Sequence, residues 1–575
     1  MAEWIYLQNN KTQPAECPDG IPASIVSMLR ERGVEGECAI RDFLAEHPRT
    51  THDPFLLPDL AESVDEILKA IDDGRKICVY GDYDADGVTS CSLLLSVLSR
   101  LTDRLCYHIP SRFIEGYGLN NRAIQQIADE GTSLIITVDC GSTSPDEVCF
   151  ARSLGVDIII TDHHSPYVSK TPDCLFVNPK RADSKYPFTG LSGCGVAFKL
   201  AQGIQRTLEA RGDSRFTRTD LNKLLDLVAI STVADVVPLL DENRSLVKYG
   251  LECLNRQERP GIRVLLELLK LGDKTLTSDN IAFIIAPNIN ALGRMGSASV
   301  GVELLTGTDE DMKRLYVLAR QMVDNNQARK SIQDDTFRQC REAMENTDCG
   351  ELFPVIFAPD AHEGVAGIVA GNLKETLYRP VFIITRRSDG QLKGTGRCIP
   401  GLNLHEMVSS CSDILTRFGG HAGACGLSLA EENLEIFRDR MQKLMSEKIA
   451  ECPDVLTEKL LIEKELDSSE KTLEFASMLQ KLEPFGADNP KPLFSVSGAS
   501  VLSVYTMGQE NQHMRFTIQG RDGVPVNCVL FRRAVEFSKL IQRGSRIDVA
   551  GELVINEYMG NYKLQLTVKD IRRNI

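Results

Sequence analysis

Apolar residues recur over residues 61–240 in two alternating patterns, short continuous runs and longer stretches with helical spacing. The runs predict strands at 76–79, 105–109, 134–138 and 156–161. The stretches predict helices at 88–101, 119–130, 145–154, 196–209 and 220–232. Because the strands are apolar at consecutive positions, they predict a parallel sheet with helices on both faces.

The pattern changes on either side of this region. Residues 1–60 are mixed in character, with one predicted helix at 21–32. Residues 241–308 are mostly helical, and 309–344 form one continuous helical pattern with a polar middle. At 1.5 Å per residue this helix would span roughly 50 Å. A helix of that length with a polar middle is typical of a bridge between two domains.

Strands and helices alternate again over residues 352–450, which predicts a second α/β unit. Its helices are expected at 365–377, 404–417 and 431–450, the second of them ending at Gly419-Gly420. Residues 493–575 consist of short strands separated by turn residues, which predicts a five-stranded barrel. The predicted domains are an N-terminal segment (1–60), a metal-binding α/β domain (61–308), a linker helix (309–349), a second α/β domain (350–452), and a link with the barrel (453–575).

Composition is that of an ordinary globular protein, with 42% hydrophobic and 25% charged residues. The 17 cysteines include no Cys-x-x-Cys pair, which predicts reduced thiols in a cytoplasmic protein. We find neither a signal-peptide pattern nor an apolar run of 18 residues, so no membrane association is expected.

Net charge is −15, which by itself argues against binding to a nucleic acid. The charge is unevenly distributed, however. Residues 498–575 hold 11 Lys and Arg against 7 Asp and Glu, a net of +4, which leaves −19 for residues 1–497. A basic barrel can therefore coexist with an acidic metal domain.

The sequence Val79-Tyr80-Gly81-Asp82-Tyr83-Asp84-Ala85-Asp86-Gly87 follows the first predicted strand and carries three carboxylates at alternate positions. Such a loop suits hard divalent cations. It is not an EF-hand loop, because Leu93 stands where that motif has its bidentate glutamate. A plain turn remains an alternative interpretation of the triplet taken alone.

Other chemical groups follow the remaining strands of the same predicted sheet. Arg112 follows the second, Asp139 the third, and Asp162-His163-His164 the fourth, while Asp235 ends an apolar helix. Ligands bind at the carboxyl edge of open α/β sheets, so these groups are expected to converge there. Carboxylates with imidazoles favour two manganese or magnesium ions, with Asp139 as the bridge. Taken singly, each motif could instead be a turn or a helix cap.

Four motifs then identify the chain as a member of a family. They are Gly-Asp-Tyr-Asp-Ala-Asp-Gly (81–87), Val-Asp-Cys-Gly (138–141), Thr-Asp-His-His (161–164) and Val-Ala-Asp-Val-Val-Pro-Leu (233–239). In this order they resemble the motifs of the DHH phosphoesterase superfamily. Residues 288–296, 418–423 and 482–490 resemble elements of its RecJ branch, the second of them in the DHH-associated domain and the third leading into an OB-fold barrel.

This resemblance implies a single-stranded-DNA-specific 5′→3′ exonuclease of DNA repair and recombination that hydrolyses phosphodiester bonds. It implies that Asp82 binds one of two metal ions, that Asp84, His163 and Asp235 bind the other, and that Asp139 bridges them. His164 would contact the scissile phosphate, and these six residues form the expected catalytic set. Asp86 is expected to brace the loop. Cys78 stands where other branches of the superfamily carry a histidine ligand.

The resemblance also implies residues that hold the rest of the DNA. Substrate phosphates are assigned to Arg112, Arg294, Thr395, Arg397 and His421, with the glycine-rich sequence Gly394-Thr395-Gly396-Arg397 read as a phosphate loop. In the barrel, Tyr558 and Tyr562 are candidates for base stacking. Phe516 and Phe531 are expected to fill the barrel core.

The expected substrate is single-stranded DNA with a 5′ end, and a single-strand-binding protein and a helicase are expected partners of a monomeric enzyme. The alternative is a DHH-type phosphodiesterase that acts on short oligonucleotides or cyclic dinucleotides. That enzyme would not need the barrel.

Overall fold

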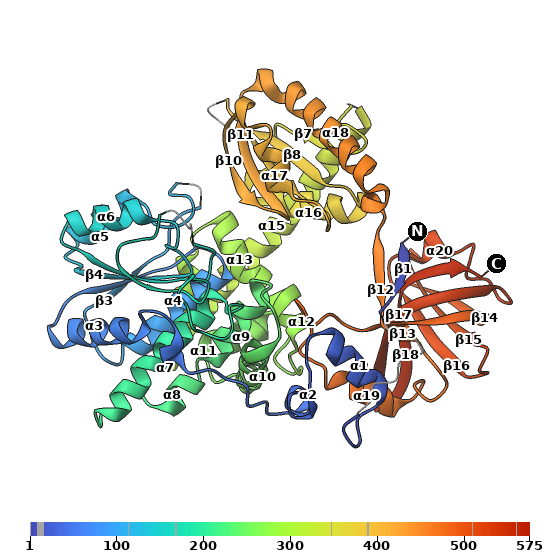
Figure 1. Ribbon diagram of the computed structural model, residues 1–575, viewed down its shortest axis with the longest axis horizontal. Helices are drawn as coiled ribbons and strands as arrows, with labels where there is room; N and C mark the ends of the chain where they lie inside the picture. The colour runs from blue at the N-terminus through green and yellow to red at the C-terminus, as the bar shows by residue number, and fades with distance from the viewer. Residues whose placement is uncertain are drawn as a thin grey trace. The chain divides into compact units, whose positions relative to one another are not determined.

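The carboxyl edge that the sequence predicts belongs to a five-stranded parallel sheet in the order β3-β2-β4-β5-β6 (Figure 1). The computed structural model describes residues 2–7, 17–112, 114–166, 170–346, 348–387, 390–508, 510–558 and 560–574. The chain folds as two units. The first comprises 4–293, 297–320 and 460–575, and the second comprises 294–296 and 321–459 with the first residues of the chain.

The parallel sheet confirms the predicted fold class. Its strands are β2 (Ile77–Tyr80), β3 (Leu105–His108), β4 (Leu134–Val138), β5 (Asp157–Thr161) and β6 (Leu175–Val177). The short β6 was not predicted from the sequence. Every residue of β2 and β4 is buried, as continuous apolar strands require.

Helices cover both faces of this sheet (Figure 1). On one face α5 (Asn121–Asp129) and α6 (Pro145–Ser153) share an apolar core with β2, β4 and β5. The other face carries α3 (Leu60–Asp72), α4 (Ala85–Leu98) and α7 (Gly193–Ala210). The helix predicted at 220–232 is divided into α8 (Arg218–Asn222) and α9 (Leu225–Ala234).

The predicted helical region and long helix are both present. The region contains α10 (Asp241–Arg256), α11 (Pro260–Leu268), α12 (Ser278–Asn280), α13 (Ala286–Met295) and α14 (Ser299–Thr306). The long helix is α15 (Met312–Asn346), with 35 residues.

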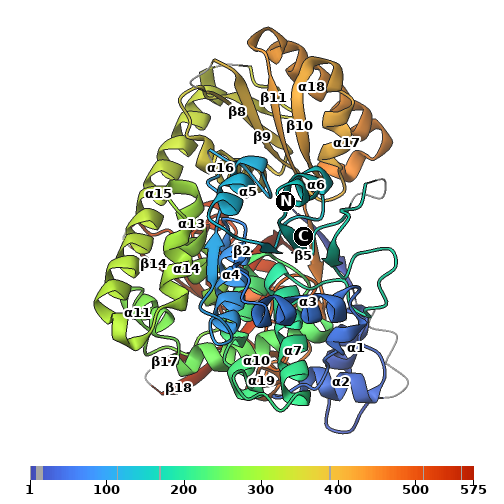
Figure 2. The same cartoon turned by 90° about the vertical axis from the view of Figure 1, so that its left-hand side faces the viewer.

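In the second unit, the sheet has the order β10-β11-β9-β8-β7, in which only β7 and β8 run parallel. Its strands are β7 (Val355–Phe357), β8 (Val381–Arg386), β9 (Leu392–Arg397), β10 (Leu415–His421) and β11 (Ala424–Leu429). One face packs on α16 (Glu363–Leu377), and the other packs on α17 (Leu404–Ser409) and α18 (Leu434–Glu451) (Figure 2). The predicted helix over 404–417 was wrong in its second half, because α17 ends at Ser409 and Gly419-Gly420 lies inside β10.

The C-terminal strands form a closed five-stranded barrel, as predicted. They are β14 (Leu493–Met507), β15 (His513–Gln519), β16 (Pro525–Leu530), β17 (Arg546–Tyr558) and β18 (Asn561–Arg573). Neighbours follow the order β14-β15-β16-β18-β17, and β17 pairs back with β14 to close the barrel. This is the strand order of an OB-fold.

The N-terminal segment, to which the sequence assigned no role, packs against this barrel. Apolar residues of α1 (Ala23–Glu31) and α2 (Glu37–Leu44) share one core with the barrel strands and α19 (Leu473–Gln480). Trp4 Nε1 donates to Asp570 Oδ2 at 2.8 Å. Within the described residues, no helix has the length and hydropathy that crossing a membrane requires.

Candidate metal centre

The Asp82–Gly87 loop turns directly from β2 into α4, and two glycines allow its tight path. A Cβ on Gly87 would lie 2.3 Å from Asp82 O, and a Cβ on Gly293 would lie 2.6 Å from Tyr83 O. Asp84 caps α4, since its Oδ1 accepts from the backbone N–H of Asp86 and Gly87 at 2.9 and 3.1 Å. The side chain of Asn290 accepts from Ala85 N at 2.8 Å, which ties α13 to the same loop.

Asp86 points toward the start of α7. Its carboxylate accepts from Gly193 N at 2.7 Å, Cys194 N at 2.8 Å and Ser231 Oγ at 2.6 Å. A carboxylate at a helix N-terminus satisfies backbone N–H groups that have no partner within the helix. Asp86 therefore joins the loop to α7 and α9.

Asp139 follows β4 in a left-handed conformation, with φ of 60°. It lies against the first residue of α7, where a Cβ on Gly193 would come within 2.6 Å of Asp139 Cβ. Only glycine leaves room for the aspartate at this position, which explains why α7 begins with Gly193.

The two histidines after β5 are arranged by Asp162. One Asp162 oxygen accepts from His163 N at 2.7 Å and His164 N at 3.1 Å, and it lies 2.8 Å from His164 Nδ1. The other accepts from Ser142 N at 2.9 Å. Burial would lower the pKa of His164, but the hydrogen bond and charge of Asp162 outweigh burial and raise it to about 9. His164 is thus an imidazolium at neutral pH, with the hydroxyl of Tyr117 at 3.2 Å from its Nδ1.

His163 occupies the middle of the cluster. Its Nε2 lies 3.2 Å from Asp139 Oδ1 and 3.5 Å from Asp235 Oδ2, at the end of α9. Burial lowers the pKa of His163, which favours the neutral imidazole that binds metals. Burial raises the pKa of Asp139 well above its usual value, and neighbouring carboxylates raise it further.

These donor atoms fit divalent metal ions. The ligand atoms form three groups, and the atoms within each group all lie within 4.8 Å of one another. The groups are Asp82, Asp84 and Asp139; Asp139, Asp162, His163 and His164; and Asp86, His163 and Asp235. Asp82 Oδ1, Asp139 Oδ1 and both ring nitrogens of His163 are buried without a hydrogen-bond partner. Buried polar atoms rarely stay unpaired, so this cluster of unpaired donor atoms is the signature expected of a cation site.

The structure brings together all six residues of the predicted catalytic set. Asp139 belongs to two of the three groups, which is the position a bridging ligand needs. Asp84 was assigned with His163 and Asp235, but its ligand atoms group with Asp82 and Asp139. The contacts of Asp162 and Tyr117 with His164 were not predicted from the sequence. Arg112 lies beside the cluster, with its guanidinium 5.5 Å from the centre of the Tyr83 ring.

Comparison with known proteins agrees with this geometry. The family model described as "DHH family, N-terminal domain" matches residues 76–232, the DHHA1 domain matches 352–447, and the RecJ OB domain matches 462–570. The single-stranded-DNA-specific exonuclease RecJ of Escherichia coli is 32% identical, and the match covers 99% of this chain and all of that protein. This chain belongs to the RecJ family.

Further relatives support the assignment. RecJ of Bacillus subtilis is 36% identical, with 95% of this chain and 67% of that protein covered. The crystal structure of RecJ from Thermus thermophilus in complex with Mn²⁺ superimposes with a TM-score of 0.80 at 29% identity, covering 96% of this chain and 76% of that one. A second structure of the Thermus protein contains Mg²⁺ and gives a TM-score of 0.72 at 27% identity. Both cations are those that the donor set favours.

In the second unit of this RecJ-family chain, three predicted phosphate-binding residues surround the start of α16. Arg294 Nη1 donates to Gly364 O at 2.8 Å. A Cβ on Gly367 would lie 3.0 Å from Arg397 Nη2 and 3.3 Å from Thr395 Cγ2. His421 is exposed at the end of β10, and it lies in register with Arg397 through Ala424 of β11, the strand between them.

The interpretation of residues 394–397 as a phosphate loop was wrong, because they form part of strand β9. Gly394 and Gly396 face the core. A Cβ on Gly396 would come within 2.6 Å of the Phe382 ring, and one on Gly394 within 2.7 Å of Leu427. These glycines leave space for apolar side chains, while Thr395 and Arg397 project from the opposite face.

The barrel exposes aromatic residues on its outer surface. Tyr562 is 58% exposed, whereas the side chain of Tyr558 lies outside the described residues. Phe516 is buried as predicted, but Phe531 was wrongly assigned to the core, since it is 52% exposed and contacts His513 edge-on. Tyr505, which the sequence analysis missed, is 61% exposed and lies opposite Arg515 on β15.

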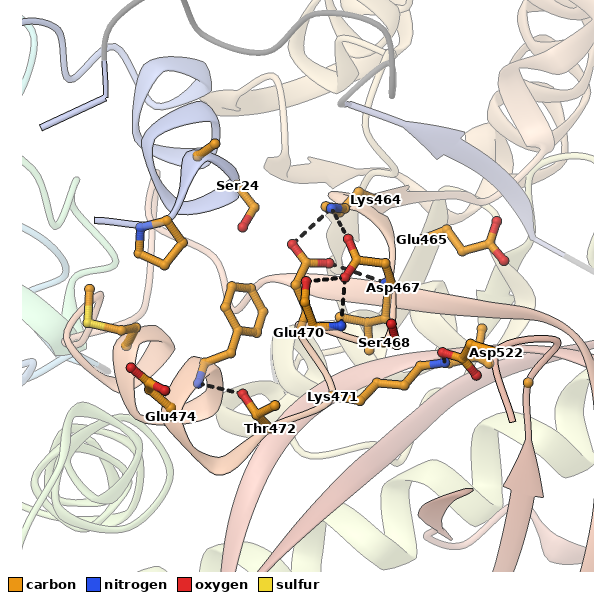
Figure 3. Close-up of a pocket in the computed structure, with 18 of the residues that line it drawn as sticks. Ser24, Lys464, Glu465, Asp467, Ser468, Glu470, Lys471, Thr472, Glu474 and Asp522 are labelled. Atoms are coloured by element: carbon orange, nitrogen blue, oxygen red, sulfur yellow. Dashed lines mark hydrogen bonds and ion pairs between the residues drawn. The ribbon is translucent and has the colours of Figure 1, made fainter. Parts of the chain in front are cut away.

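A polar cavity of about 1090 Å³ lies between α1, α19 and the barrel (Figure 3). Lys464 pairs there with Glu470 at 2.8 Å, and Lys471 pairs with Asp522 at 2.5 Å. Since carboxylates already neutralise these two lysines, they offer no free charge to a phosphate.

Proposed function

We propose that this chain is a metal-dependent exonuclease that removes nucleotides from the 5′ end of single-stranded DNA. The observation that carries the proposal is the set of buried, unpartnered donor atoms on Asp82, Asp139 and His163. These atoms would hold two manganese or magnesium ions together with Asp84 and Asp235. When bound, the ions would stabilise the charge that develops during in-line displacement at phosphorus.

The protein's own groups have separate roles in this proposal. His164, held charged by Asp162, donates a hydrogen bond to an oxygen of the scissile phosphate. Asp139 is fixed by its close packing against Gly193 and keeps its carboxylate between Asp82 and His163. Arg112 supplies a second positive charge beside the cluster for a phosphate oxygen.

The remaining DNA contacts are divided between the second unit and the barrel. Arg294, Thr395, Arg397 and His421 bind the phosphate groups near the 5′ end. Tyr562, together with Tyr558, stacks on bases farther along the strand, and the exposed Tyr505 and Phe531 add to this surface. Base stacking is tolerant of sequence because every base has an aromatic face.

The family assignment supports a proposal for the cellular setting. We propose that the protein acts as a monomer in the cytoplasm, in DNA repair and recombination. Single-strand-binding protein and a helicase would supply the unwound strand on which such an exonuclease depends.

The test is a degradation assay with single-stranded DNA labelled at either end and supplied with manganese, magnesium or a chelator. Release of mononucleotides from the 5′ label first, with no activity in chelator and at least tenfold slower cleavage of a blunt duplex, is the expected result. Asp139→Ala serves as the control for contaminating nucleases. Equal rates on the two substrates, or an active Asp139→Ala protein, would refute the proposal.

A further inference from the structure

Two cysteines outside the metal centre occupy directly opposed positions on neighbouring strands. Cys78 of β2 pairs in register with Cys106 of β3. Both contribute to the apolar cluster beneath α5, so their side chains lie on the same face of the sheet. Paired parallel strands run about 4.8 Å apart, which is within the range of about 4.4–6.8 Å between the Cα atoms of a disulfide.

The two thiols differ in exposure in a way that suits oxidation. Cys78 is buried, whereas Cys106 is half-buried on β3, which forms the edge of the sheet. Cys106 Sγ donates to Ile77 O at 3.6 Å and lies 3.7 Å from Thr132 Oγ1, while the neighbouring Cys78 thiol lowers the pKa of Cys106 to about 6. A lowered pKa raises the share of thiolate at neutral pH, and the thiolate is the reactive form of cysteine.

We propose that Cys78 and Cys106 form a reversible disulfide when the protein meets a peroxide. The Cys106 thiolate attacks one peroxide oxygen, the O–O bond breaks, and the sulfur becomes a sulfenic acid. The released hydroxide or alkoxide takes a proton from the solvent and leaves as water or an alcohol. The Cys78 sulfur then loses its proton and attacks the Cys106 sulfur. The S–S bond forms as the S–O bond breaks, and the departing hydroxide takes up the proton as water.

This disulfide would disturb the metal centre through strand β2. Cβ atoms joined by a disulfide lie about 3.8 Å apart, so closure from the spacing of paired strands moves them together by roughly 1 Å. Cys78 lies in β2, every residue of which is buried, and Asp82 follows the carboxyl end of this strand, four residues after Cys78. A displacement of about 1 Å at a catalytic group can cost on the order of 100-fold in rate. This consequence, unlike the disulfide itself, rests on the proposed function.

The test treats the manganese-loaded protein with hydrogen peroxide, alkylates the remaining thiols and maps the linked peptides by mass spectrometry. Nuclease rate and manganese affinity are measured before treatment, after it, and after reduction with dithiothreitol. Cys106→Ser removes the half-buried thiol of the proposed disulfide. Cys149→Ser is the matched control, because Cys149 is exposed on α6 outside the pair.

We expect a peptide pair linked through Cys78 and Cys106 in the wild type and in Cys149→Ser, with a reversible loss of activity of ten- to 100-fold. Cys106→Ser should form no such link and should keep its activity under peroxide. Absence of the linked peptides would overturn the disulfide. Linked peptides with unchanged activity, or equal inactivation of Cys106→Ser, would overturn its effect on the site. A protein inactive before any oxidation would refute the proposed function, while the peptide map would still report on the disulfide.

Discussion

Gly193→Ala tests whether the position of Asp139 sets the activity of the metal centre. The added Cβ would stand 2.6 Å from Asp139 Cβ and 2.8 Å from its Oδ1. Carbon atoms in favourable contact are about 3.5–4.0 Å apart, so one of the two residues must move by roughly 1 Å. Asp139 is anchored on its other side by the hydrogen bond from its N–H to Thr161 O at 3.1 Å, and Gly193 by its N–H to Asp86.

The substitution is expected to lower both the stability of the fold and the activity. Overpacking of this kind costs about 1–3 kcal/mol of folding free energy. If Asp139 bridges two metal ions as proposed, a misplacement of about 1 Å should lower kcat/KM by roughly 100-fold. Manganese affinity should fall as well, since both neighbouring groups of donor atoms use Asp139.

Gly195→Ala is the matched control in the same helix. The atoms nearest to its Cβ would belong to Leu191 and Ser192, at 3.3 Å or more, so the substitution should be tolerated. The assays are calorimetric titration with Mn²⁺, kcat/KM on single-stranded DNA, and urea unfolding of the metal-free proteins. The reasoning fails if Gly193→Ala retains wild-type manganese affinity and rate within about threefold, or if Gly195→Ala loses as much.

Three further predictions concern the buried Arg244, the aromatic surface of the barrel and Asp235 of the metal centre. The buried guanidinium of Arg244 donates only to main-chain carbonyls, those of Phe43, Lys481, Leu482 and Glu483. Arg244→Leu leaves acceptors unpaired and should cost roughly 3–5 kcal/mol, and an unchanged urea midpoint would contradict this. Replacing both Tyr505 and Phe531 by Ala should weaken binding of a long single strand by at least tenfold in fluorescence anisotropy and leave tetranucleotide cleavage unaltered. The loss of binding should exceed that caused by the control Tyr316→Ala, which removes an exposed aromatic residue from α15. Burial and neighbouring carboxylates raise the pKa of Asp235 to about 8, so a proton must leave before a metal ion binds. Manganese affinity should therefore rise from pH 6 to pH 8, and titrations in buffers of different ionisation enthalpy should show proton release; an affinity independent of pH would count against this.

The local sequence pattern was sufficient to predict a strand wherever consecutive residues of that strand are buried. The apolar runs at 76–79 and 134–138 match β2 and β4 within one residue at each end. The parallel topology then placed Asp82, Asp139 and His163 at one edge without any knowledge of their contacts. What the runs could not supply was the grouping of ligands, because the N-cap role of Asp84 depends on where α4 begins.

The structural role of several glycines could not be predicted from the residues next to them in the sequence. Gly419-Gly420 resembles the end of a helix, yet a Cβ on Gly420 would lie 2.3 Å from Ala424 O of the paired strand β11. Gly396 resembles part of a phosphate loop, yet it accommodates the Phe382 ring. In both places the need for glycine comes from a residue that the sequence does not identify as a neighbour. The same limit hid the packing of α1 and α2 on the barrel, since their apolar stripes fit many possible partners.

The acidity of the whole chain is compatible with a DNA substrate because charge acts locally at physiological salt. The Debye length is about 8 Å there, so a DNA phosphate responds to the groups it approaches and hardly to the net charge of −15. At the metal centre burial raises the pKa of Asp82 and Asp139, repulsion between neighbouring carboxylates raises it further, and divalent cations would relieve that repulsion. At the barrel the balance is positive, and arginines stand beside exposed aromatic rings. In the proposed function, acidic residues would bind the ions that the reaction needs and a separate basic surface would attract the strand, so neither charge would have to offset the other.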